Sequence, residues 1–328
     1  MEKFCWNILG AGAMGTVTAW LLQQQGHGVR LLSQHTKPQI RCLDYSDVNV
    51  ATMQVRGDSS SQLGRAARDP TSSQTESFVT VPVANLPAES ISHLIVNTKA
   101  TDCAEAFSFI DHALKSNAWV VLTSNGMGFE RELEPYWRDR VFLRTVSTTA
   151  AHRPQPDEIV LAAIGQTRLG FSPMLRPQAY DEGLLDYDIK SLFALPGWSW
   201  HFNIDHMVQR KFCLNCVINP ITAVLGCLNG DLLKPGEGAT MLKELATEVE
   251  SVARVLDLWT GSESLHDAAL SVCRSTAGNR SSTLQDIQAG RRTEIAYLNG
   301  ELLARAGDLK LALPLCQRLV DTLDKALI

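Results

Sequence analysis

The chain has 328 residues, of which 45% are hydrophobic and 20% charged, so it can bury an ample core and suits two globular domains. Its formal net charge is -5 at pH 7 and it has no long basic run, which argues against nucleic acid or an acidic membrane surface as the main partner; a locally basic cleft could still attract a small anion. No run of about eighteen apolar residues occurs, so we expect no membrane-spanning segment.

The first predicted elements form a βαβ unit. The start Met1-Glu2-Lys3 lacks the ordered features of a signal peptide, and the short apolar run from Phe4 to Leu9 predicts a strand. A glycine-rich turn at residues 10–15 leads into a helical pattern that ends near Gly26, and Val29 to Leu32 predicts a second strand.

The glycine turn has the pattern GxGxxG and lies between a predicted strand and a predicted helix, which is the context that dinucleotide binding requires. Gly10 permits the tight turn, Gly12 lets the backbone approach a pyrophosphate, and Gly15 lets helix and strand pack closely. The helix N-terminus offers free N–H groups and a positive dipole end to phosphate. We therefore favour a cofactor loop over a purely structural turn, formed by Gly10, Ala11, Gly12, Ala13, Met14 and Gly15.

The end of the second strand indicates which dinucleotide binds. An acidic residue about 20 positions after the loop would hold a ribose 2′-OH, yet none occurs between Gly28 and Leu43. Basic residues are present there instead, and they would tolerate or attract a 2′-phosphate: Arg30, His35, Lys37 and Arg41. The sequence therefore predicts NADP(H) as the cofactor.

Further apolar runs predict strands at residues 94–98, 120–123 and 141–146, with a possible helix at 102–114 between the first two. Such alternation is typical of an α/β fold with a doubly wound, mainly parallel sheet of the Rossmann type. Residues 56–77 are rich in Ser, Arg, Gly and Thr, and we interpret them as a mobile excursion between strands.

The last strands of this domain are predicted at residues 158–171 and 198–202. The first range resembles a hairpin with its turn near Gly165-Gln166, which would extend the sheet at an antiparallel edge. From Asp205 onward the pattern becomes helical, with long segments at 205–227, 239–257 and 282–305. We thus predict a Rossmann-type domain at residues 1–203 and an all-α domain at 204–328.

The eight cysteines are scattered, which fits buried thiols in a reducing cytosol better than a disulfide framework, and we expect a cytoplasmic protein. Cys213-x-x-Cys216 has the spacing of a metal or redox pair. It lacks a second CxxC or a His pair and lies among apolar residues, so core packing is favoured and no metal is expected.

A polar stripe interrupts the apolar helix predicted at 205–227. Lys211, Asn215 and Asn219 recur every four residues and so lie on one side of the helix. One interpretation is a snorkelling lysine with two amides that cap neighbours. The other is a site, because a stripe of polar side chains on an otherwise apolar helix needs a ligand or another polar surface to face.

Other polar residues stand where ligands bind in open α/β sheets, beyond the carboxyl ends of strands. Lys99 follows the strand at 94–98, and Asn125 follows the strand at 120–123. Ser281 and Ser282 precede a predicted helix, where they could bind a carboxylate or act as simple N-caps.

Several motifs, in order and spacing, make the chain similar to the ketopantoate reductase (2-dehydropantoate 2-reductase) family. Besides GAGAMG at the N-terminus, they are NTKA at 97–100, SNGMG at 124–128, RKFCLNCVINPITA at 210–223, NRSSTLQDI at 279–287 and RRTEIAYLNG at 291–300. The resemblance implies a Rossmann-type domain followed by a helical domain, with a 2-keto acid substrate bound between them and reduced by NADPH.

The resemblance also implies roles for single residues. Lys211 is the general acid, the proton donor that a ketone needs within about 3 Å of its oxygen when it receives a hydride. Asn125 is a catalytic residue near the nicotinamide and the catalytic lysine, and Glu294 serves both the catalytic and the cofactor site. Lys99 contacts the cofactor. Substrate binding is implied for Lys211 and for Asn215, Asn219, Asn229, Asn279 and Ser282.

Two positions depart from the family pattern, and some alternatives stay open. Gln34-His35 stands where the family often has an arginine for the 2′-phosphate, and the histidine of residues 148–153 is shifted. Burial would lower the pKa of Lys211 while Glu294 would raise it, so the balance is open. A reductase of another branched 2-keto acid and a non-catalytic NADP-binding regulator remain alternatives, as do a monomer and a homodimer.

Overall fold

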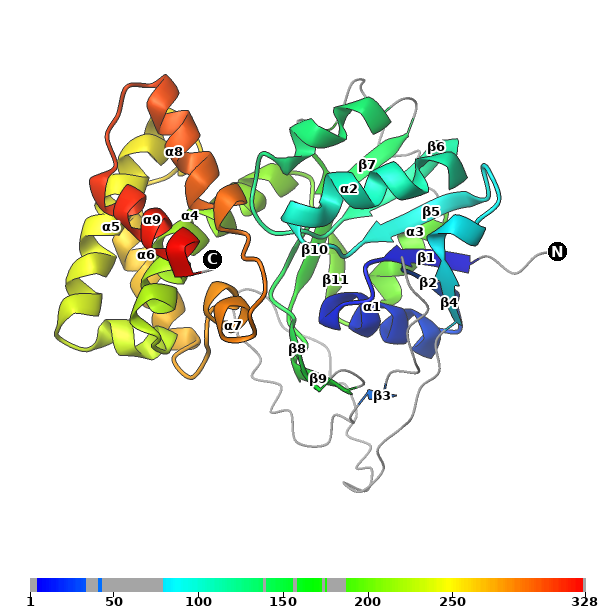
Figure 1. Cartoon of the computed structure of the whole chain (residues 1–328), viewed down its shortest axis with the longest axis horizontal. Coiled ribbons are helices and arrows are strands. Elements are labelled where there is room, and N and C mark those ends of the chain that lie inside the picture. Colours follow the sequence, from blue (N-terminus) through cyan, green and yellow to red (C-terminus); the bar gives the residue numbers. More distant parts are fainter. Residues whose placement is uncertain are drawn as a thin grey trace.

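The computed structural model describes residues 5–33, 41–42, 79–137, 140–155, 158–172, 175 and 187–326. Figure 1 shows an α/β domain formed by the longer N-terminal part of the chain and a helical domain formed by the C-terminal part from α4 (Ile204–Leu225) onward, lying side by side. The predicted fold class is confirmed. The predicted excursion at 56–77 and the bases His35 and Lys37 lie outside the described residues.

Within the described ranges, the α/β domain contains an eight-stranded sheet of order β11-β10-β7-β6-β5-β1-β2-β4. All neighbours in it are parallel except β10, which runs antiparallel to β7. The strands are Cys5–Leu9 (β1), Gly28–Ser33 (β2), Val79–Pro82 (β4), Ile91–Val96 (β5), Leu114–Leu122 (β6), Val141–Ser147 (β7), Thr167–Phe171 (β10) and Trp198–Trp200 (β11).

The central strands are apolar on both faces, so helices cover both, as a doubly wound sheet requires. Ile8 and the next residue, Leu9, belong to different core clusters because side chains alternate along a strand. Ile8 packs on the side of helix α1 (Ala13–Gln24), and Leu9 packs on the side of α2 (Ala100–Ile110). The smaller helices of this domain are Val83–Asn85 (η1), Asp111–Ala113 (η2), Phe129–Tyr136 (η3), Tyr187–Ser191 (α3) and Leu192–Ala194 (η6).

A second sheet corrects the predicted hairpin at 158–171. It is three-stranded in the described part of the chain and consists of Arg41–Cys42 (β3), Ala150–Gln155 (β8) and Glu158–Ala163 (β9). β9 pairs antiparallel with β8 and not with β10, which joins the main sheet instead. The turn near Gly165 was placed correctly, but a turn signal does not say which strands lie on either side of it in space.

The helical domain begins with α4 (Ile204–Leu225). The side chain of Asn203 caps its start, and Gly226, with φ of 62°, ends it in the left-handed conformation. Pro220 lacks an N–H for the carbonyl of Cys216, and the buried amide of Asn299 donates to that carbonyl instead, at 2.8 Å. The remaining helices are Asn229–Leu233 (η7), Glu237–Val255 (α5), Leu265–Ser275 (α6), Ser282–Gln288 (α7), Ile295–Tyr297 (η8), Asn299–Asp308 (α8) and Pro314–Ala326 (α9).

The predicted single helix at 282–305 is wrong. Gly290 adopts φ of 62° after α7, and the chain turns through residues 289–294 before η8 and α8 begin. Glu294 therefore stands at the start of η8, outside the regular helix in which its apolar neighbours had placed it. This break matters because it frees Glu294 to reach the other domain.

The helical core contains the two cysteines of the CxxC pair. Cys213 and Cys216 are fully buried among apolar side chains of the helical domain, as the packing interpretation predicted.

No group of three or more potential metal ligands occurs in the ranges given above. None of the helices described is long and apolar enough to cross a membrane. The domain boundary between residues 203 and 204 remains our proposal.

Candidate active site

The glycine loop shows two different uses of its three glycines. Gly10 has φ of 102°, and a Cβ there would lie 2.8 Å from the backbone of Asn97; a Cβ on Gly15 would lie 1.9 Å from the carbonyl oxygen of Gly10. Both positions therefore need glycine for the fold itself. A Cβ on Gly12 would meet no protein atom within 4 Å, so this glycine borders open space in which a ligand can approach the backbone.

The N-terminus of α1 faces the same space. Its cap, Gly12, has no side chain to satisfy the N–H groups of the first turn, which leaves them for an anion. Arg153, from β8, donates a hydrogen bond of 2.7 Å to the carbonyl of Ala11 in the loop. A pyrophosphate group fits this combination of open backbone, helix terminus and guanidinium.

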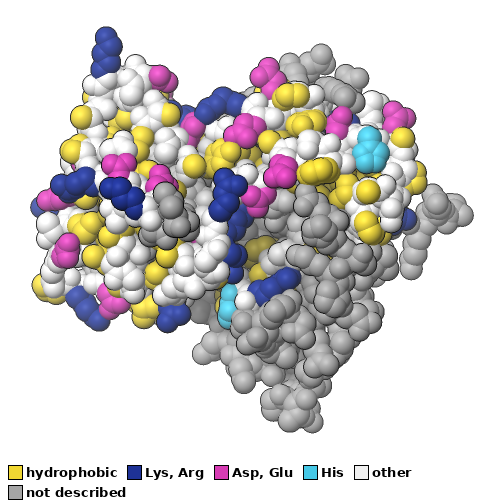
Figure 2. All heavy atoms as spheres, in the orientation of Figure 1, with side chains coloured by type: hydrophobic (Ala, Val, Ile, Leu, Met, Phe, Trp, Pro, Cys, Tyr) yellow, Lys and Arg dark blue, Asp and Glu magenta, His cyan; other side chains and the backbone are white. Residues whose placement is uncertain are grey.

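A cavity of about 910 Å³ opens beside the loop, between the two domains. Among the described residues, the charged ones that line it are all basic, namely Lys211, Arg153, Arg280 and Arg291. Figure 2 shows Lys and Arg side chains gathered along this hollow. A cleft lined by one sign of charge attracts ligands of the opposite sign. The locally basic cleft that the overall negative charge left possible is thus present.

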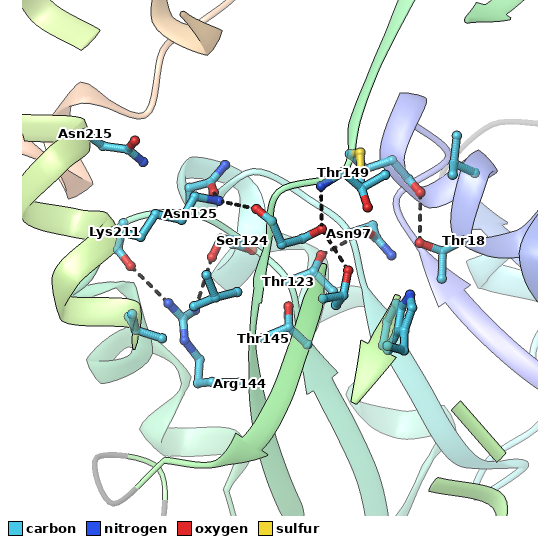
Figure 3. A pocket seen from close by; sticks show the side chains of 18 of the residues that line it. Thr18, Asn97, Thr123, Ser124, Asn125, Arg144, Thr145, Thr149, Lys211 and Asn215 are labelled. Carbon is cyan, nitrogen blue, oxygen red and sulfur yellow. Dashed lines mark hydrogen bonds between the residues drawn. The ribbon is translucent and has the colours of Figure 1, made fainter. Parts of the chain in front are cut away.

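Lys211, in the N-terminal half of α4, lines this cleft and also the smaller neighbouring pocket that Figure 3 shows. Its ammonium donates to Oδ1 of Asn125 at 2.8 Å and to the carbonyl of Ser147 at 2.9 Å. Burial lowers the pKa of Lys211 to about 8; Glu294 opposes this shift, and Arg144 adds to it. The balance that the sequence left open is decided in favour of the lowered pKa.

Glu294 completes a chain of hydrogen bonds across the domains. Asn125 Nδ2 donates to Oε2 of Glu294 at 3.2 Å, and the backbone N–H of Ala100 donates to Oε1 at 3.0 Å. Burial raises the pKa of Glu294, although these two hydrogen bonds and the nearby Lys99 oppose the rise. Asn125 is thus held from both ends, by Lys211 and by Glu294.

The rest of the polar stripe faces the same cleft. Asn215 and Asn219 line it together with Lys211, so the three side chains point to one cavity rather than to bulk solvent. Ser282 lines it too and lies 3.4 Å from Nδ2 of Asn219, whereas Ser281 is the N-cap of α7 and bonds to the N–H of Leu284. Asn279 is part of the same wall.

Apart from the glycine loop, of which only Met14 lines this cavity, three predicted residues stand outside its lining. Lys99 forms an ion pair of 2.9 Å with Asp286 and donates to the carbonyl of Arg292, so it joins the two domains. Asn229 is buried; its side chain donates to Thr276, and its N–H donates to the carbonyl of Asn279. Asn229 therefore supports the turn that carries Asn279, and Glu294 acts from behind Asn125.

Sequence reasoning missed two arginines of the site. Arg153 was considered only as part of the shifted segment 148–153, and its contact with Ala11 depends on β8, a strand that was not predicted. Arg144 interrupts the apolar run of β7 and lines a smaller cavity of about 120 Å³ next to Lys211 (Figure 3). A charged residue inside a buried strand was a usable signal for it.

A glycine-loop α/β domain, a helical domain and a lysine between them define a dinucleotide-dependent oxidoreductase of two domains. The chain matches the family "Ketopantoate reductase PanE/ApbA" over residues 6–173 and "Ketopantoate reductase PanE/ApbA C terminal" over residues 203–326. It belongs to the ketopantoate reductase family, as its motifs indicated.

Relatives agree with this assignment. The 2-dehydropantoate 2-reductase of Yersinia pestis is 32% identical over 321 residues, which cover 97% of this chain and 94% of that protein. Two solved structures share the fold. D-mandelate dehydrogenase with NADH and anilino(oxo)acetate has a TM-score of 0.77 at 21% identity, covering 98% of each chain. The dimeric ketopantoate reductase from Staphylococcus aureus has a TM-score of 0.76 at 16% identity, covering 99% of each chain.

Proposed function

We propose that this protein is an NADPH-dependent 2-dehydropantoate 2-reductase, which reduces the keto group of 2-dehydropantoate to the alcohol of pantoate and so serves pantothenate biosynthesis. One observation carries the proposal. Lys211 and Asn125 line the cleft beside the glycine loop and are hydrogen-bonded to each other, and Glu294 supports Asn125 from behind, in a member of this family.

The reaction places negative charge on the keto oxygen as hydride arrives at the neighbouring carbon. NADPH supplies that hydride when it is bound. Lys211 is a suitable proton donor because its pKa of about 8 lies close to neutral pH, where an acid is both protonated and able to release its proton. Asn125 fixes the direction of the ammonium by accepting one of its hydrogen bonds.

The wall of the cleft can bind the rest of a 2-keto acid. Asn215 and Asn219 can donate to hydroxyl or keto oxygens without adding charge, and Ser282 with Asn279 can hold a carboxylate. The basic residues Arg153, Arg280 and Arg291 favour ligands that are anionic as a whole. These roles form one proposal for the substrate site.

NADPH is the proposed cofactor because the second strand carries Arg30 and lacks the acidic residue that would hold a free ribose hydroxyl. The ratio of kcat/KM for NADPH and for NADH measures this preference. A higher value with NADH would contradict it.

Cellular location and assembly are part of the proposal as well. Among the cysteines whose side chains are described, all are free thiols, which suits a reducing cytoplasm. The ligands are small molecules rather than nucleic acid, and the protein is a monomer or a homodimer. Its mass in solution, measured by light scattering, decides between these two.

The test of the function is the oxidation of NADPH by the purified full chain, followed by absorbance. We expect the highest kcat/KM with 2-dehydropantoate, compared with a branched 2-keto acid that lacks the hydroxymethyl group and with an aromatic 2-keto acid. A higher value with either competitor would reassign the substrate. Tight NADPH binding without turnover of any 2-keto acid would instead indicate the non-catalytic regulator.

A further inference from the structure

A buried ion pair lies directly beneath the loop that carries Asn125. Arg144 belongs to β7, and its side chain is only 2% exposed. Its partner Glu130, at the start of η3, is 4% exposed, and Nη2 of Arg144 lies 3.4 Å from its carboxylate. The guanidinium also lies over the ring of Phe129, 4.8 Å from the ring centre. A full charge is thus enclosed next to the proposed active site.

The hydrogen bonds of Arg144 are directed at the two residues that flank Asn125. Nη1 donates to the carbonyl of Ser124 at 3.3 Å, and Nη2 donates to the carbonyl of Gly126 at 3.0 Å. Figure 3 shows the guanidinium extending from β7 towards Ser124, below Lys211 and Asn125. Because the two carbonyls stand on either side of Asn125, the planar guanidinium holds the backbone of that residue in one orientation.

A contribution to stability does not by itself explain why Arg144 and Glu130 are buried as an ion pair. Removing two charges from water costs several kcal/mol per ion in general, and apolar residues of similar volume often serve a core equally well. The contacts of Arg144 nevertheless converge on the loop that orients Lys211. The geometry therefore calls for a role in the reaction.

We propose that Arg144 is a positioning residue for the reaction: it fixes Asn125 against Lys211, and its charge promotes release of the Lys211 proton to the substrate oxygen. This inference rests on the proposed function, since it assigns Lys211 as the donor. It adds a residue of the α/β sheet to a site that the family motifs place in loops and in α4.

The charges around Lys211 support the second part of this role. Glu294, from the segment before η8, favours the charged lysine, whereas burial and Arg144 favour the neutral one. Glu130 is paired with Arg144, and Asp205 at the start of α4 also interacts electrostatically with Arg144. In the described part of the chain, the other charged groups that line the cleft are Arg153, Arg280 and Arg291, with no acidic residue among them. Loss of the Arg144 charge therefore leaves Glu294, together with the unpaired Glu130, as the acidic influence on Lys211.

The test compares Arg144→Met, which removes charge and hydrogen bonds, with Arg144→Lys, which keeps the charge but cannot bind both carbonyls as a fork. Two quantities are measured: kcat for NADPH oxidation with 2-dehydropantoate, and the titration of Lys211 without cofactor or substrate. The titration follows the lysine carbon signals of ¹³C-labelled protein by NMR, with Lys211 assigned by its loss in Lys211→Met.

For Arg144→Met we expect kcat to fall about tenfold or more and the titration of Lys211 to move up by about half a pH unit or more, because a nearby positive charge is lost. For Arg144→Lys we expect a lower kcat with the titration still near the wild-type value. An unchanged titration in Arg144→Met would overturn the proposed charge effect, and an unchanged kcat would overturn the positioning.

Arg140→Met is the matched control. Arg140 precedes the same strand, has a side chain that is 0% exposed, and pairs with Asp111 away from the cleft. We expect Arg140→Met to lower the melting temperature without changing kcat or the titration of Lys211. If Arg140→Met changed both as much as Arg144→Met does, the role of Arg144 would be structural only. If Arg144→Met does not fold, the double variant with Glu130→Gln removes the whole pair. Its kcat is read in the same way, but its upward titration shift should be smaller, because a negative charge is lost together with the positive one. Because the titration needs no substrate, it decides on Arg144 even if wild type reduces no 2-keto acid.

Discussion

Lys211 owes its chemistry to where α4 places it. The helix is apolar around it, so its ammonium loses water. Within the described residues, the ammonium donates to the amide of Asn125 and to the carbonyl of Ser147, and Asn125 in turn donates to the carboxylate of Glu294. The desolvation lowers its pKa to about 8, within reach of physiological pH. An exposed lysine with the same hydrogen bonds would hold its proton too firmly to be an efficient donor.

Replacement of the donor should remove most of the activity while the fold stays intact. For Lys211→Met we expect kcat to fall by about 10² to 10⁴-fold, the usual range for loss of a general acid. Lys243→Met, at an exposed position of α5, should leave kcat unchanged. A fall of less than about tenfold in Lys211→Met would contradict the donor role, since it corresponds to under about 1.4 kcal/mol of barrier.

The pH dependence follows from the sign of the same shift. Lys211 donates only when protonated, so kcat/KM should be level below its pKa and decline as the pH rises through about 8. A lysine of ordinary pKa would keep its proton to about pH 10. Measurement of kcat/KM between about pH 6 and pH 10 distinguishes these two cases. A level profile up to about pH 10 would exclude Lys211 as the titrating donor.

At the scale of elements, the sequence predicted correctly those turns and helix ends that are formed by residues adjacent in the chain. The turn between β1 and α1 and the two ends of α4 depend on residues next to each other in the chain, and both were predicted within a few residues. The segment 282–305 failed because its apolar spacing continues through Gly290, whose left-handed conformation ends α7. Similarly, β9 and β10 were recognised as strands, but their partners are set by the sheets they join.

The glycine loop provides an element-scale test with a built-in comparison. In Gly15→Ala the new Cβ would lie 1.9 Å from the carbonyl oxygen of Gly10, so α1 must move and stability should fall by about 1 to 3 kcal/mol. In Gly12→Ala the Cβ enters open space, so stability should change by less than about 0.5 kcal/mol.

Gly12→Ala, which should leave stability nearly unchanged, should nevertheless weaken the binding of NADPH. Gly12→Ala occupies the space where the pyrophosphate approaches the backbone, so we expect a Kd for NADPH about tenfold or more above wild type despite the intact fold. Thermal unfolding and NADPH fluorescence titration measure the two effects. Unchanged NADPH binding in Gly12→Ala would show that the cofactor does not use this loop.

At the scale of the whole molecule, the two domains are joined by polar contacts around the site. Arg131 of η3 makes a two-pronged contact with Glu301 of α8, at 3.0 and 2.6 Å, and Arg305 adds a third hydrogen bond of 2.8 Å. Lys99 and Asp286 form a further link between the domains. These contacts hold Glu294 and Asn125 within bonding distance although they belong to different domains.

Removal of the Glu301 carboxylate should weaken this junction. Burial raises the pKa of Glu301, but the hydrogen bonds from Arg131 and Arg305 outweigh it, so the pKa lies below the ordinary value of 4.5. The charged form therefore stabilises the fold above that value, and this contribution is lost as the pH falls through the lowered pKa. For Glu301→Gln we expect the free energy of unfolding at pH 7 to fall by about 1 to 3 kcal/mol.

Urea unfolding at several pH values measures this difference, which should shrink in acid. Glu263→Gln serves as the comparison, because Glu263 pairs with Arg210 at 2.8 Å on the surface, where about half of each side chain is exposed. Loss of that pair should cost less than about 1 kcal/mol. A similar cost for both variants would mean that the interdomain contact is no stronger than a surface one.

The sequence by itself determined what depends on neighbours in the chain: the glycine loop, the helix of Lys211 with its polar stripe, and, through ordered motifs, the family. Only the tertiary structure brought Lys211 to Asn125, which is 86 positions away, and Asn125 to Glu294, which is 169 positions away. It also decided that burial outweighs Glu294 in setting the pKa of Lys211, and that Arg144 lies beneath the loop. Periodicity reports which face of an element is polar, whereas distance and desolvation depend on segments that meet only when the chain is folded.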